Sequence, residues 1–576
     1  MSQRTVYLET FGCQMNELDS ELVAGQLRAL GYRFTPTPAA ADVVLFNTCS
    51  VRERAEQKVW SRLGELQLRK KEDPGLVVGV LGCMAERDGV DLVRRMPVVD
   101  VLVGPGELDK LPGLLDNAVR TRESLISDEE AVASGKAAAK SARQVALQGN
   151  TSRRSATLAA AQDSLELLDL SRSVSPIDED EHASKRSAYV RITRGCNKFC
   201  TYCVVPFTRG AEIHRPPDHI VDECKRLADA GVIEITLLGQ TVNHYRFEHG
   251  AAVSVDGIVQ PQKGRAFAGG HRRDPLAGQN VTTFADLLRR IHDEVPSIKR
   301  LRFVTSYPRD FGDDVLEVIR DHPRICRYLH VPAQSGSDRM LQMMNRGYTV
   351  GEYLEFLDRC RHYLDQPEIG RPLMLSGDFI VGFPTETDED FEATISLLHR
   401  ARYKNSFIFK YSPRPGTIAF DKLADDVPEA TKRLRNNLLL AEQNKISDEI
   451  STAQIGREFE VLIEGLSRKE EKRRKRQPAA APGLVSLTVG GRDATEPAAE
   501  STGDACGSDD HDCGCSTKVH VQSDSDAPVQ LSARTDADLI VFMDAPAGRD
   551  PQSFVGTLQR VRINAANNLS LHGVMI

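Results

Sequence analysis

Short hydrophobic runs alternate with helix-like segments over the first 120 residues. The runs TVYL, DVVLF and LVVGVLG begin at residues 5, 42 and 76, and each is followed by apolar residues at helical spacing. Strands that alternate with helices are typical of a parallel sheet, in which every loop after a strand opens on the same edge. The pattern therefore predicts a βα domain with a parallel sheet over residues 3–120.

The same alternation returns over residues 182–448, now with six units. Helical patterns separate the strand-like runs, and one of them opens on the acid-rich turn TDEDF. The six runs are AYVRI, VIEITLLG, RLRFVT, ICRYLHV, LSGDFIVGF and NSFIFKY. Because six βα units are fewer than the eight of a closed barrel, we expect an open α/β barrel whose active face lies at the carboxyl ends of its strands.

The last part of the chain, residues 451–576, has short strand-like runs instead. These runs are FEVLIEGL, VQLSAR, LIVFMD, FVGTLQRVRI and LSLHGVMI. They predict a small five-stranded, OB-like β-barrel of the kind that binds oligonucleotides. Arg534, Arg560 and Arg562 are candidate phosphate contacts, although exposed arginines on a small barrel more often belong to a merely solvated surface.

Three stretches lack the period of a helix or a strand. Residues 121–181 are rich in Ala, Ser and charge, which predicts a low-complexity linker. Residues 248–281 hold many Gly and Pro residues and predict a long surface loop. Residues 468–527 predict a disordered insertion in the small barrel. It opens on RKEEKRRKRQ, whose seven basic and two acidic residues are expected to attract phosphate without specifying a sequence.

Composition narrows the class of protein. The chain has 576 residues, of which 27% are charged and 40% hydrophobic, enough for several domains. The N-terminus resembles neither a secretory signal nor a transit peptide, and no apolar run approaches the length of a membrane span, so we expect a cytoplasmic protein without a membrane partner. A net charge of −8 argues against a protein that coats nucleic acid, but leaves room for a local basic surface.

Twelve cysteines are too sparse for a secreted disulfide framework and suggest metal ligands, catalytic groups or core residues. Cys13, Cys49 and Cys83 each follow one of the three N-terminal strands, 36 and 34 residues apart, and should converge on one edge of the sheet. A single cysteine there would be an ordinary buried residue. Three in equivalent loops favour a shared metal or cluster site.

The stretch RGCNKFCTYC places Cys196, Cys200 and Cys203 at C-x3-C-x2-C spacing, directly after the first barrel strand. Zinc ribbons and fingers pair two short motifs, and here no second pair lies nearby. A [4Fe–4S] cluster normally takes four cysteines, so three thiolates leave one iron open to a substrate or cofactor. Tyr202 gives the loop an aromatic flank.

C-x3-C-x2-C after the first strand of an open barrel resembles the radical S-adenosylmethionine (SAM) superfamily, in which SAM occupies the open iron. The surrounding sequence is similar, segment by segment, to the methylthiotransferase family, and within it to the members that act on tRNA. The segments are ETFGCQMNELDSE, FNTCSVRERAEQKVWSRLGEL, GCMAER, TRGCNKFCTYCVVPFTRG, LLGQTVNHY, QSGSDRMLQMMNRGYT, DFIVGFPTETDEDF and FKYSPRPGT.

This resemblance implies two [4Fe–4S] clusters, an auxiliary one on the N-terminal cysteines and a SAM-cleaving one on the C-x3-C-x2-C motif. It also implies a C-terminal TRAM domain that binds tRNA, an electron donor such as flavodoxin or ferredoxin, and a monomer. GCQMN and NTCSVRE resemble the members that methylthiolate N6-(dimethylallyl)adenosine next to the anticodon. The alternatives are members acting on threonylcarbamoyladenosine in tRNA or on a ribosomal protein, and, from another class, an RNA-binding protein with structural zinc. The sulfur donor stays unknown.

The remaining cysteines carry weaker signals. Cys506, Cys513 and Cys515, with His511, could hold zinc, but without a C-x2-C pair a loop with spare thiols is the better interpretation. Cys224, Cys326 and Cys360 lie in helix or strand patterns and are expected to be core residues.

Overall fold

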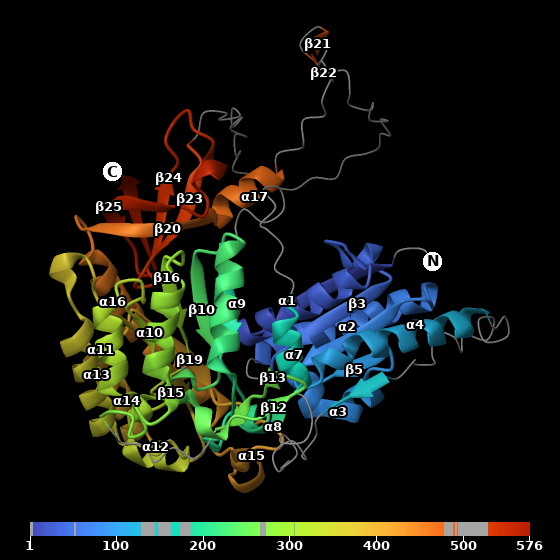
Figure 1. The fold of residues 1–576 in the computed structure, drawn as a ribbon, viewed down its shortest axis with the longest axis horizontal. Helices are drawn as coiled ribbons and strands as arrows, with labels where there is room; N and C mark the ends of the chain where they lie inside the picture. The colour runs from blue at the N-terminus through green and yellow to red at the C-terminus, as the bar shows by residue number, and fades with distance from the viewer. Residues whose placement is uncertain are drawn as a thin grey trace, which may run out of the picture.

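The computed structural model describes residues 4–50, 53–127, 144–147, 163–172, 186–264, 272–304, 306–476, 488–489, 492–493 and 528–576. Figure 1 shows an N-terminal sheet flanked by helices, a larger barrel beside it, and a small β-barrel above them. The predicted α/β fold with a C-terminal β-barrel is confirmed. Among the described residues, no helix has both the length and the apolar character needed to cross a bilayer.

The N-terminal sheet has six parallel strands in the order β2-β1-β3-β4-β5-β6. They are β1 (Thr5–Phe11), β2 (Arg33–Phe34), β3 (Val43–Thr48), β4 (Val77–Gly82), β5 (Val101–Val103) and β6 (Gln144–Ala146). Alternate residues of β3 pack on opposite faces, one with helices α1 (Gln14–Ala29) and α4 (Leu111–Ser127), the other with α2 (Glu53–Glu72) and α3 (Cys83–Arg95). The result is the three-layer arrangement that buries both faces of a parallel sheet.

The region predicted as a linker contains three ordered pieces. Helix α4 continues to Ser127, β6 adds a strand to the sheet, and α7 (Ser164–Leu170) packs two leucines into the N-terminal core. Asp163 caps α7 by accepting a hydrogen bond from the Glu166 amide at 3.0 Å. The sequence pattern left room for one short helix in this linker but placed neither β6 nor α7, because a three-residue strand and a seven-residue helix are too short to show a period.

The middle of the chain forms the predicted open barrel of six parallel strands. They are β7 (Ser187–Arg191), β10 (Glu234–Leu238), β16 (Arg300–Phe303), β17 (Tyr328–His330), β18 (Met374–Val381) and β19 (Asn405–Lys410). Two three-stranded sheets, β16-β10-β7 and β17-β18-β19, meet through one parallel bridge between Leu301 and Ile325. In the described residues β7 and β19 do not pair with each other, so the barrel stays open between them.

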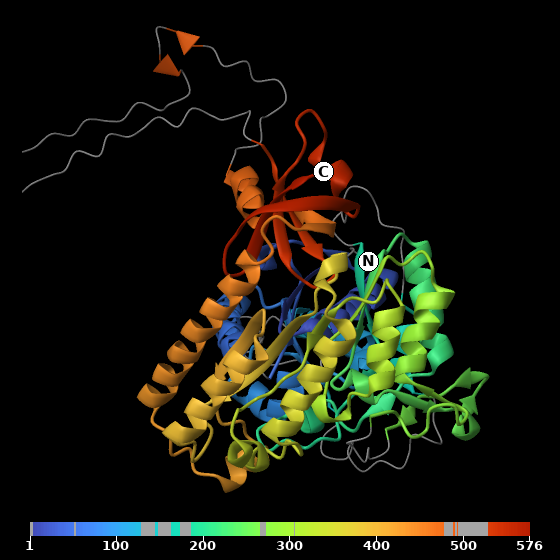
Figure 2. The ribbon, with the colours of Figure 1, turned by 90° about the vertical axis from the view of Figure 1, so that its left-hand side faces the viewer.

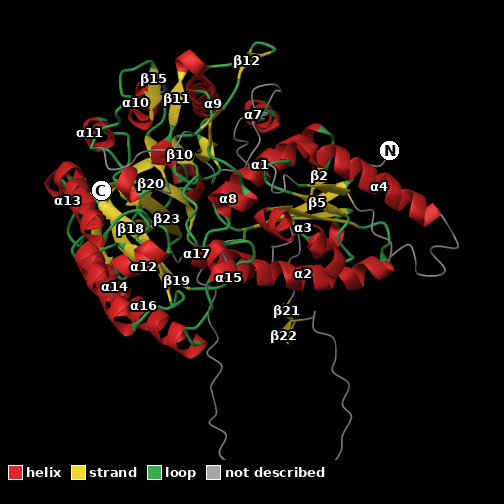
Figure 3. Ribbon diagram, turned by 90° about the horizontal axis from the view of Figure 1, so that it is seen from below, coloured by secondary structure: helices red, strands yellow, loops and turns green. Residues whose placement is uncertain are grey.

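Helices surround the barrel strands, as the view in Figure 3 shows. They are α9 (Pro217–Asp229), α10 (Phe284–Glu294), α11 (Asp313–Asp321), α13 (Val350–Leu364), α14 (Asp388–Ala401) and α16 (Glu429–Thr452), with the shorter α8 (Val205–Thr208), α12 (Asp338–Met343) and α15 (Ile418–Lys422). Small strands decorate it: β8 (Thr193–Arg194), β9 (Ile213–His214), β11 (Arg246–Glu248), β12 (Ser254–Val255), β13 (Ile258–Val259), β14 (Gln262–Lys263) and β15 (Val281–Thr283). Three of them, β12 to β14, lie within the predicted loop 248–281, and β15 begins at its last residue.

The C-terminal part is a closed barrel in the order β20-β23-β24-β26-β25 (Figure 2). Its strands are β20 (Glu458–Leu466), β23 (Gln530–Thr535), β24 (Ile540–Asp544), β25 (Leu558–Ala566) and β26 (Ser570–Met575). A basic helix, α17 (Arg468–Arg476), follows β20, and a small hairpin joins β21 (Thr488–Val489) to β22 (Arg492–Asp493). The predicted insertion therefore begins with an ordered helix.

The small barrel sits against the amino ends of the open barrel's strands. Arg300 and Arg302 of β16 donate hydrogen bonds to backbone carbonyls of β20, β23 and the turn after β23. Lys404, directly before β19, lies 2.5 Å from a carboxylate oxygen of Asp538. The carboxyl ends of the strands, where the C-x3-C-x2-C loop lies, face the opposite way.

Candidate active site

Cys13, Cys49 and Cys83, here called the first trio, lie at neighbouring ends of three parallel strands. Cys13 caps α1 after β1, Cys49 follows β3, and Cys83 begins α3 after β4. The strand ends are in register, because Phe11 pairs with Thr48, which pairs with Gly82. The structure thus brings together the three cysteines that the sequence predicted to converge.

Two asparagines hold these loops in place. The Asn16 side chain donates hydrogen bonds to Asn47 Oδ1 (2.9 Å) and to the Thr48 carbonyl (3.1 Å), and the Cys13 thiol donates to Asn16 Oδ1 (3.3 Å). Gly82 has φ of 89°, and a Cβ there would lie 2.4 Å from Asn47 Oδ1, so the close approach requires glycine. The motifs GCQMN and NTC therefore encode the support of these loops as well as the cysteines.

A buried arginine lies beside the first trio. Arg209 interacts with Cys13 and Cys83, and Asp19 of α1 holds its guanidinium at 2.8 Å. A hydrogen bond with Cys49 lowers the pKa of the Cys13 thiol to about 6; burial opposes this shift and Arg209 supports it. Burial raises the pKa of Cys83, against the pull of Arg209. Sequence reasoning missed Arg209 and Asp19, which lie 190 positions apart.

Cys196, Cys200 and Cys203, here called the second trio, share one loop beyond β7. The Cys203 amide donates to the Cys200 carbonyl at 3.0 Å, and the Cys196 amide donates to the Gly210 carbonyl at 3.2 Å. Gly195 has φ of 72°, and a Cβ there would come within 2.0 Å of a backbone oxygen. Burial raises the pKa of Cys196 to about 11 and that of Cys203 further, with contributions from the neighbouring sulfurs.

Arg346 brings positive charge to the second trio. Its Nη1 atom lies 3.5 Å from Cys200 Sγ and 3.4 Å from Tyr202 Oη. Its guanidinium also lies 4.8 Å from the centre of the Tyr307 ring, a cation–π distance. A buried cation of this kind offsets the cost of ionising thiols in an apolar loop.

The two trios are linked through a short segment. Helix α8 begins two residues after Cys203 and packs against α3, the helix that Cys83 begins. Arg209 directly follows α8 and reaches the first trio. The loop that carries the second trio therefore leads, through α8, to Arg209, whose side chain lies beside the first trio.

The donor sets fit clusters better than single ions. Within the described part of the chain, only His292, Asp293 and His322 bring three possible ligand atoms close enough for one ion. Neither trio forms such a group, and a zinc–sulfur bond of about 2.3 Å would demand it. Each trio combines buried and partly buried thiols, with an arginine beside them. Three thiols spaced more widely in this way suit an anionic iron–sulfur cluster.

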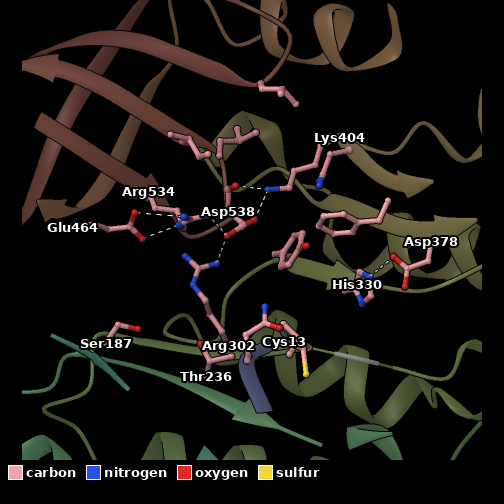
Figure 4. A pocket seen from close by; sticks show the side chains of 18 of the residues that line it. Cys13, Ser187, Thr236, Arg302, His330, Asp378, Lys404, Glu464, Arg534 and Asp538 are labelled. Atoms are coloured by element: carbon pink, nitrogen blue, oxygen red, sulfur yellow. Dashed lines mark hydrogen bonds and ion pairs between the residues drawn. The ribbon is translucent and has the colours of Figure 1, made fainter. Parts of the chain in front are cut away.

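A cavity of about 660 Å³ lies between all three parts of the structure. The N-terminal part contributes Cys13, Gln14 and Cys49, the open barrel contributes strand residues, and the small barrel contributes residues of its strands and turns. Figure 4 shows Cys13 at one side of the cavity, with Arg534 and Asp538 across from it. The second trio does not line this cavity.

Paired charges occupy one wall of the cavity. Asp538 lies 2.7 Å from Arg534, and Arg534 also binds Glu464 at 2.7 Å. Burial would raise the pKa of Asp538, but Lys404 and the neighbouring arginines hold it well below its usual range. Burial lowers the pKa of Lys404 to about 8, partly offset by Asp538. These pairs leave little free positive charge on this wall.

The predicted phosphate contacts occupy two different environments. Arg534 lies in the cavity wall, tied to two carboxylates, instead of on the open surface. Arg560 and Arg562 are exposed and both pair with Glu458. The structure therefore does not gather the three arginines into one basic patch.

Apolar and aromatic side chains form another part of the cavity. Phe407 and Phe409 of β19 are partly exposed there, and His330 lies 3.2 Å from Asp378. Tyr328, Leu539, Ile540 and Leu569 also line it. Such a mixture suits a planar, partly apolar group better than a phosphate.

The remaining cysteines divide as follows. Cys224, Cys326 and Cys360 are buried, as expected of core residues. Cys506, Cys513, Cys515 and His511 lie outside the described residues.

Two family models match the chain. The model described as "Uncharacterized protein family UPF0004" covers residues 5–104, and that of the radical SAM superfamily covers residues 190–398. The curated "tRNA-2-methylthio-N(6)-dimethylallyladenosine synthase" of Rhodopirellula baltica is 43% identical over 470 residues, spanning 81% of this chain and 85% of the relative. The proteins of that name from Roseobacter denitrificans and Coxiella burnetii are 38% and 39% identical, over 80% and 81% of this chain and 88% and 90% of theirs.

This chain belongs to the tRNA-2-methylthio-N6-dimethylallyladenosine synthase family. The resemblance found in the sequence is thereby confirmed. As a member, the chain is a radical SAM methylthiotransferase that uses SAM and two iron–sulfur clusters. A solved radical SAM methyltransferase, TsrM from Kitasatospora setae, overlaps 73% of this chain and 77% of its own, at 15% identity and a TM-score of 0.44.

Proposed function

We propose that this protein methylthiolates N6-(dimethylallyl)adenosine next to the anticodon of tRNA. In this proposal the first trio holds an auxiliary [4Fe–4S] cluster and the second trio holds the cluster that binds SAM. One observation carries the proposal: the cavity reaches Cys13 and Cys49 on one side and an RNA-binding type of barrel on the other. A nucleotide in that cavity would lie beside the first trio.

The cofactors supply the hard chemistry, because SAM bound at a three-cysteine cluster yields a radical able to remove hydrogen from an unactivated carbon. The residues of the chain supply placement. A base must leave its stack to enter the cavity, where Phe407 and Phe409 offer apolar surface to it. Three parts of the chain line the cavity around the base.

The same proposal covers the finer properties of the system. The N-terminal part, the open barrel and the small barrel are assigned to residues 3–120, 182–448 and 451–576. Strand β6 and helix α7, from the segment between the first two, join the N-terminal part, and the insertion over 468–527 begins with α17. The protein acts as a cytoplasmic monomer and takes electrons from a flavodoxin or ferredoxin. The basis for these assignments is the family likeness and the spacing of the elements along the chain.

A three-substrate comparison tests the proposal. The reconstituted enzyme, with SAM, a reductant and a sulfur source, is given dimethylallylated tRNA, threonylcarbamoylated tRNA and the ribosomal protein, and the products are analysed by mass spectrometry. We expect methylthiolation of the first substrate. A tRNA without the prenyl group should react poorly, because the five carbons of that group, once buried, contribute about 4 kcal/mol to the binding free energy.

The outcomes separate the alternatives. Preference for either of the other substrates would overturn the substrate assignment and leave the two-cluster chemistry intact. A colourless protein that contains zinc and no iron after anaerobic preparation would overturn the enzymatic assignment itself.

A further inference from the structure

The basic helix α17 has no role in the function proposed above. It holds seven basic and two acidic residues, a net charge of +5 in a chain whose net charge is −8. A basic run of this kind is often only a solvated surface. Whether α17 binds a ligand therefore has to be judged from how it is attached to the small barrel and from where it lies.

The helix is fixed to the small barrel at its start. The Ser467 amide donates to the Gln530 carbonyl of β23 at 2.9 Å, and the Ser467 hydroxyl accepts from the Glu470 amide at 3.2 Å. Glu470 is 4% exposed and binds Arg473 and Arg474, one and the same carboxylate serving both. A buried cap and an internal ion pair orient the helix on β23.

Three basic side chains remain directed to solvent. Arg468, Lys469 and Lys472 are exposed, and among the residues that the structure describes no carboxylate forms an ion pair with any of them. Every arginine and lysine that lines the cavity is, by contrast, paired with a carboxylate. The basic side chains that line the cavity are thus engaged by carboxylates, whereas these three on α17 are available to a polyanion.

The position of α17 matches the path of a bound RNA. Strand β20 carries Glu464, which lines the cavity, and Arg468 comes four residues later, roughly 13 Å along an extended chain. Figures 1 and 2 show α17 beside the small barrel, on the side of β20 and β23. A nucleotide in the cavity would place its neighbouring phosphates within reach of this helix.

We infer that α17 binds the phosphate backbone of the RNA whose nucleotide enters the cavity, through Arg468, Lys469 and Lys472. The inference rests on the proposed function for its choice of RNA. Contacts to phosphate fix position and add affinity without reading sequence. The helix thus compensates locally for a chain whose overall charge repels RNA.

The test compares two triple variants of equal charge. Arg468→Gln, Lys469→Gln and Lys472→Gln keep good helix formers and leave the pairs of Glu470 intact. The control variant, Lys71→Gln, Arg94→Gln and Arg120→Gln, removes three exposed charges from α2, α3 and α4. Binding of tRNA to the reconstituted full-length protein is measured from 50 to 200 mM salt.

We expect the α17 variant to bind tRNA on the order of tenfold more weakly at low salt, with a salt slope lower by about 2 to 3, as three lost phosphate contacts require. Its KM for tRNA should rise while kcat stays unchanged, and the control should match the unmodified protein. Equal slopes for the two variants would overturn the inference. Loss of binding to vesicles containing phosphatidylserine, with tRNA binding unchanged, would overturn it in favour of a membrane surface.

The inference and the proposed function fail separately. Protein that binds tRNA through α17 but methylthiolates none of the three substrates would refute the function alone. Normal methylthiolation together with a salt slope unaffected by the α17 substitutions would refute the inference alone.

Discussion

The two cysteine trios present the same number of thiols on different supports. The first trio is spread over three strand ends, 36 and 34 residues apart in sequence, and two asparagines lock its loops together. The second trio lies within eight residues of one loop. The pKa of Cys13 is lowered to about 6, whereas burial raises that of Cys196 to about 11.

The difference shows two ways of building a three-thiol site. The sheet itself shapes the first, since moving its cysteines apart would require breaking strand pairs. The second depends on hydrogen bonds to segments far along the chain. The Thr201 amide donates to the Met344 carbonyl at 3.1 Å, and the Thr201 carbonyl accepts from the Ala419 amide at 2.8 Å. The first site is therefore tied to the pairing of the strands, and the second to contacts made by Met344 and Ala419 far along the chain.

Separating the trios by substitution should give the largest effect. Cys203→Ala should abolish reductive cleavage of SAM, because only the second trio binds it in our proposal. Cys49→Ala should leave SAM cleavage intact and abolish methylthiolation. Each variant should lose about half of roughly eight iron atoms per chain. Iron content and 5′-deoxyadenosine formation are the measurements.

Cys224→Ala is the control for these variants, because Cys224 is as buried as Cys49 but lies in helix α9 of the barrel core. It should retain both activities and all its iron. SAM cleavage that survived Cys203→Ala and disappeared with Cys49→Ala would reverse the division of labour between the trios.

Local patterns predicted most of the frame and little of the connection between the trios. Hydrophobic runs fixed the three central N-terminal strands and all six barrel strands, and cysteines directly after them had to appear at strand ends. Arg346 reaches Cys200 across 146 positions, and Asp19 reaches Arg209 across 190. No local period records such contacts, so the arginines beside both trios emerged only from the fold.

Removing the buried carboxylate of Asp19, which holds Arg209 beside the first trio, should have the next largest effect. Asp19 is 0% exposed and binds both Arg191 (3.3 Å) and Arg209 (2.8 Å). Arg191 keeps Asp169 at 2.7 Å, but Asp19→Asn would take from the buried Arg209 the carboxylate that the structure describes beside it, at a cost of about 3–5 kcal/mol in the free energy of unfolding. Urea unfolding of the variant measures this cost.

An exposed ion pair provides the contrast for Asp19. Glu449→Gln removes the partner of Arg402 on the surface, where both side chains are about half exposed. The loss there should stay below about 1 kcal/mol. Equal losses of unfolding free energy in the two variants would mean that the buried Asp19–Arg209 pair contributes no more than an ordinary surface pair.

The pH dependence of helix α7 should be smaller and confined to acid. Burial opposes ionisation of Glu166, but Arg215 (2.9 Å) and His219 (3.0 Å) lower its pKa to about 2. The folded-state pKa lies below the ordinary value of 4.5, so the unfolded chain binds more protons between these values. The stability gained from Glu166, about 3 kcal/mol at most, is complete above pH 4.5 and is lost as the pH falls toward 2.

Comparison with Glu166→Gln isolates this contribution, because glutamine has the same shape and does not titrate. The stability of the native protein should exceed that of the variant at pH 6, and the gap should narrow between pH 4.5 and pH 3. A gap that stayed constant over this range would show that the carboxylate does not contribute through its charge. A gap that widened in acid would reverse the sign of the shift.

The smallest expected effect concerns the late cysteines, and it decides whether the comparison involves two cysteine sites or three. Cys506, Cys513 and Cys515 have no paired C-x2-C spacing, so we expect no metal ligation by them. Replacing all three with serine should leave about eight iron atoms per chain and bind no less zinc than the native protein. Metal analysis after anaerobic reconstitution measures both.

Excision of residues 470–525 is the second test, since it also removes His511 while sparing Arg468, Lys469 and both trios. Lost iron in either protein would make the late cysteines ligands, and a third kind of site, held neither by a sheet edge nor by a pinned barrel loop, would have to join the comparison.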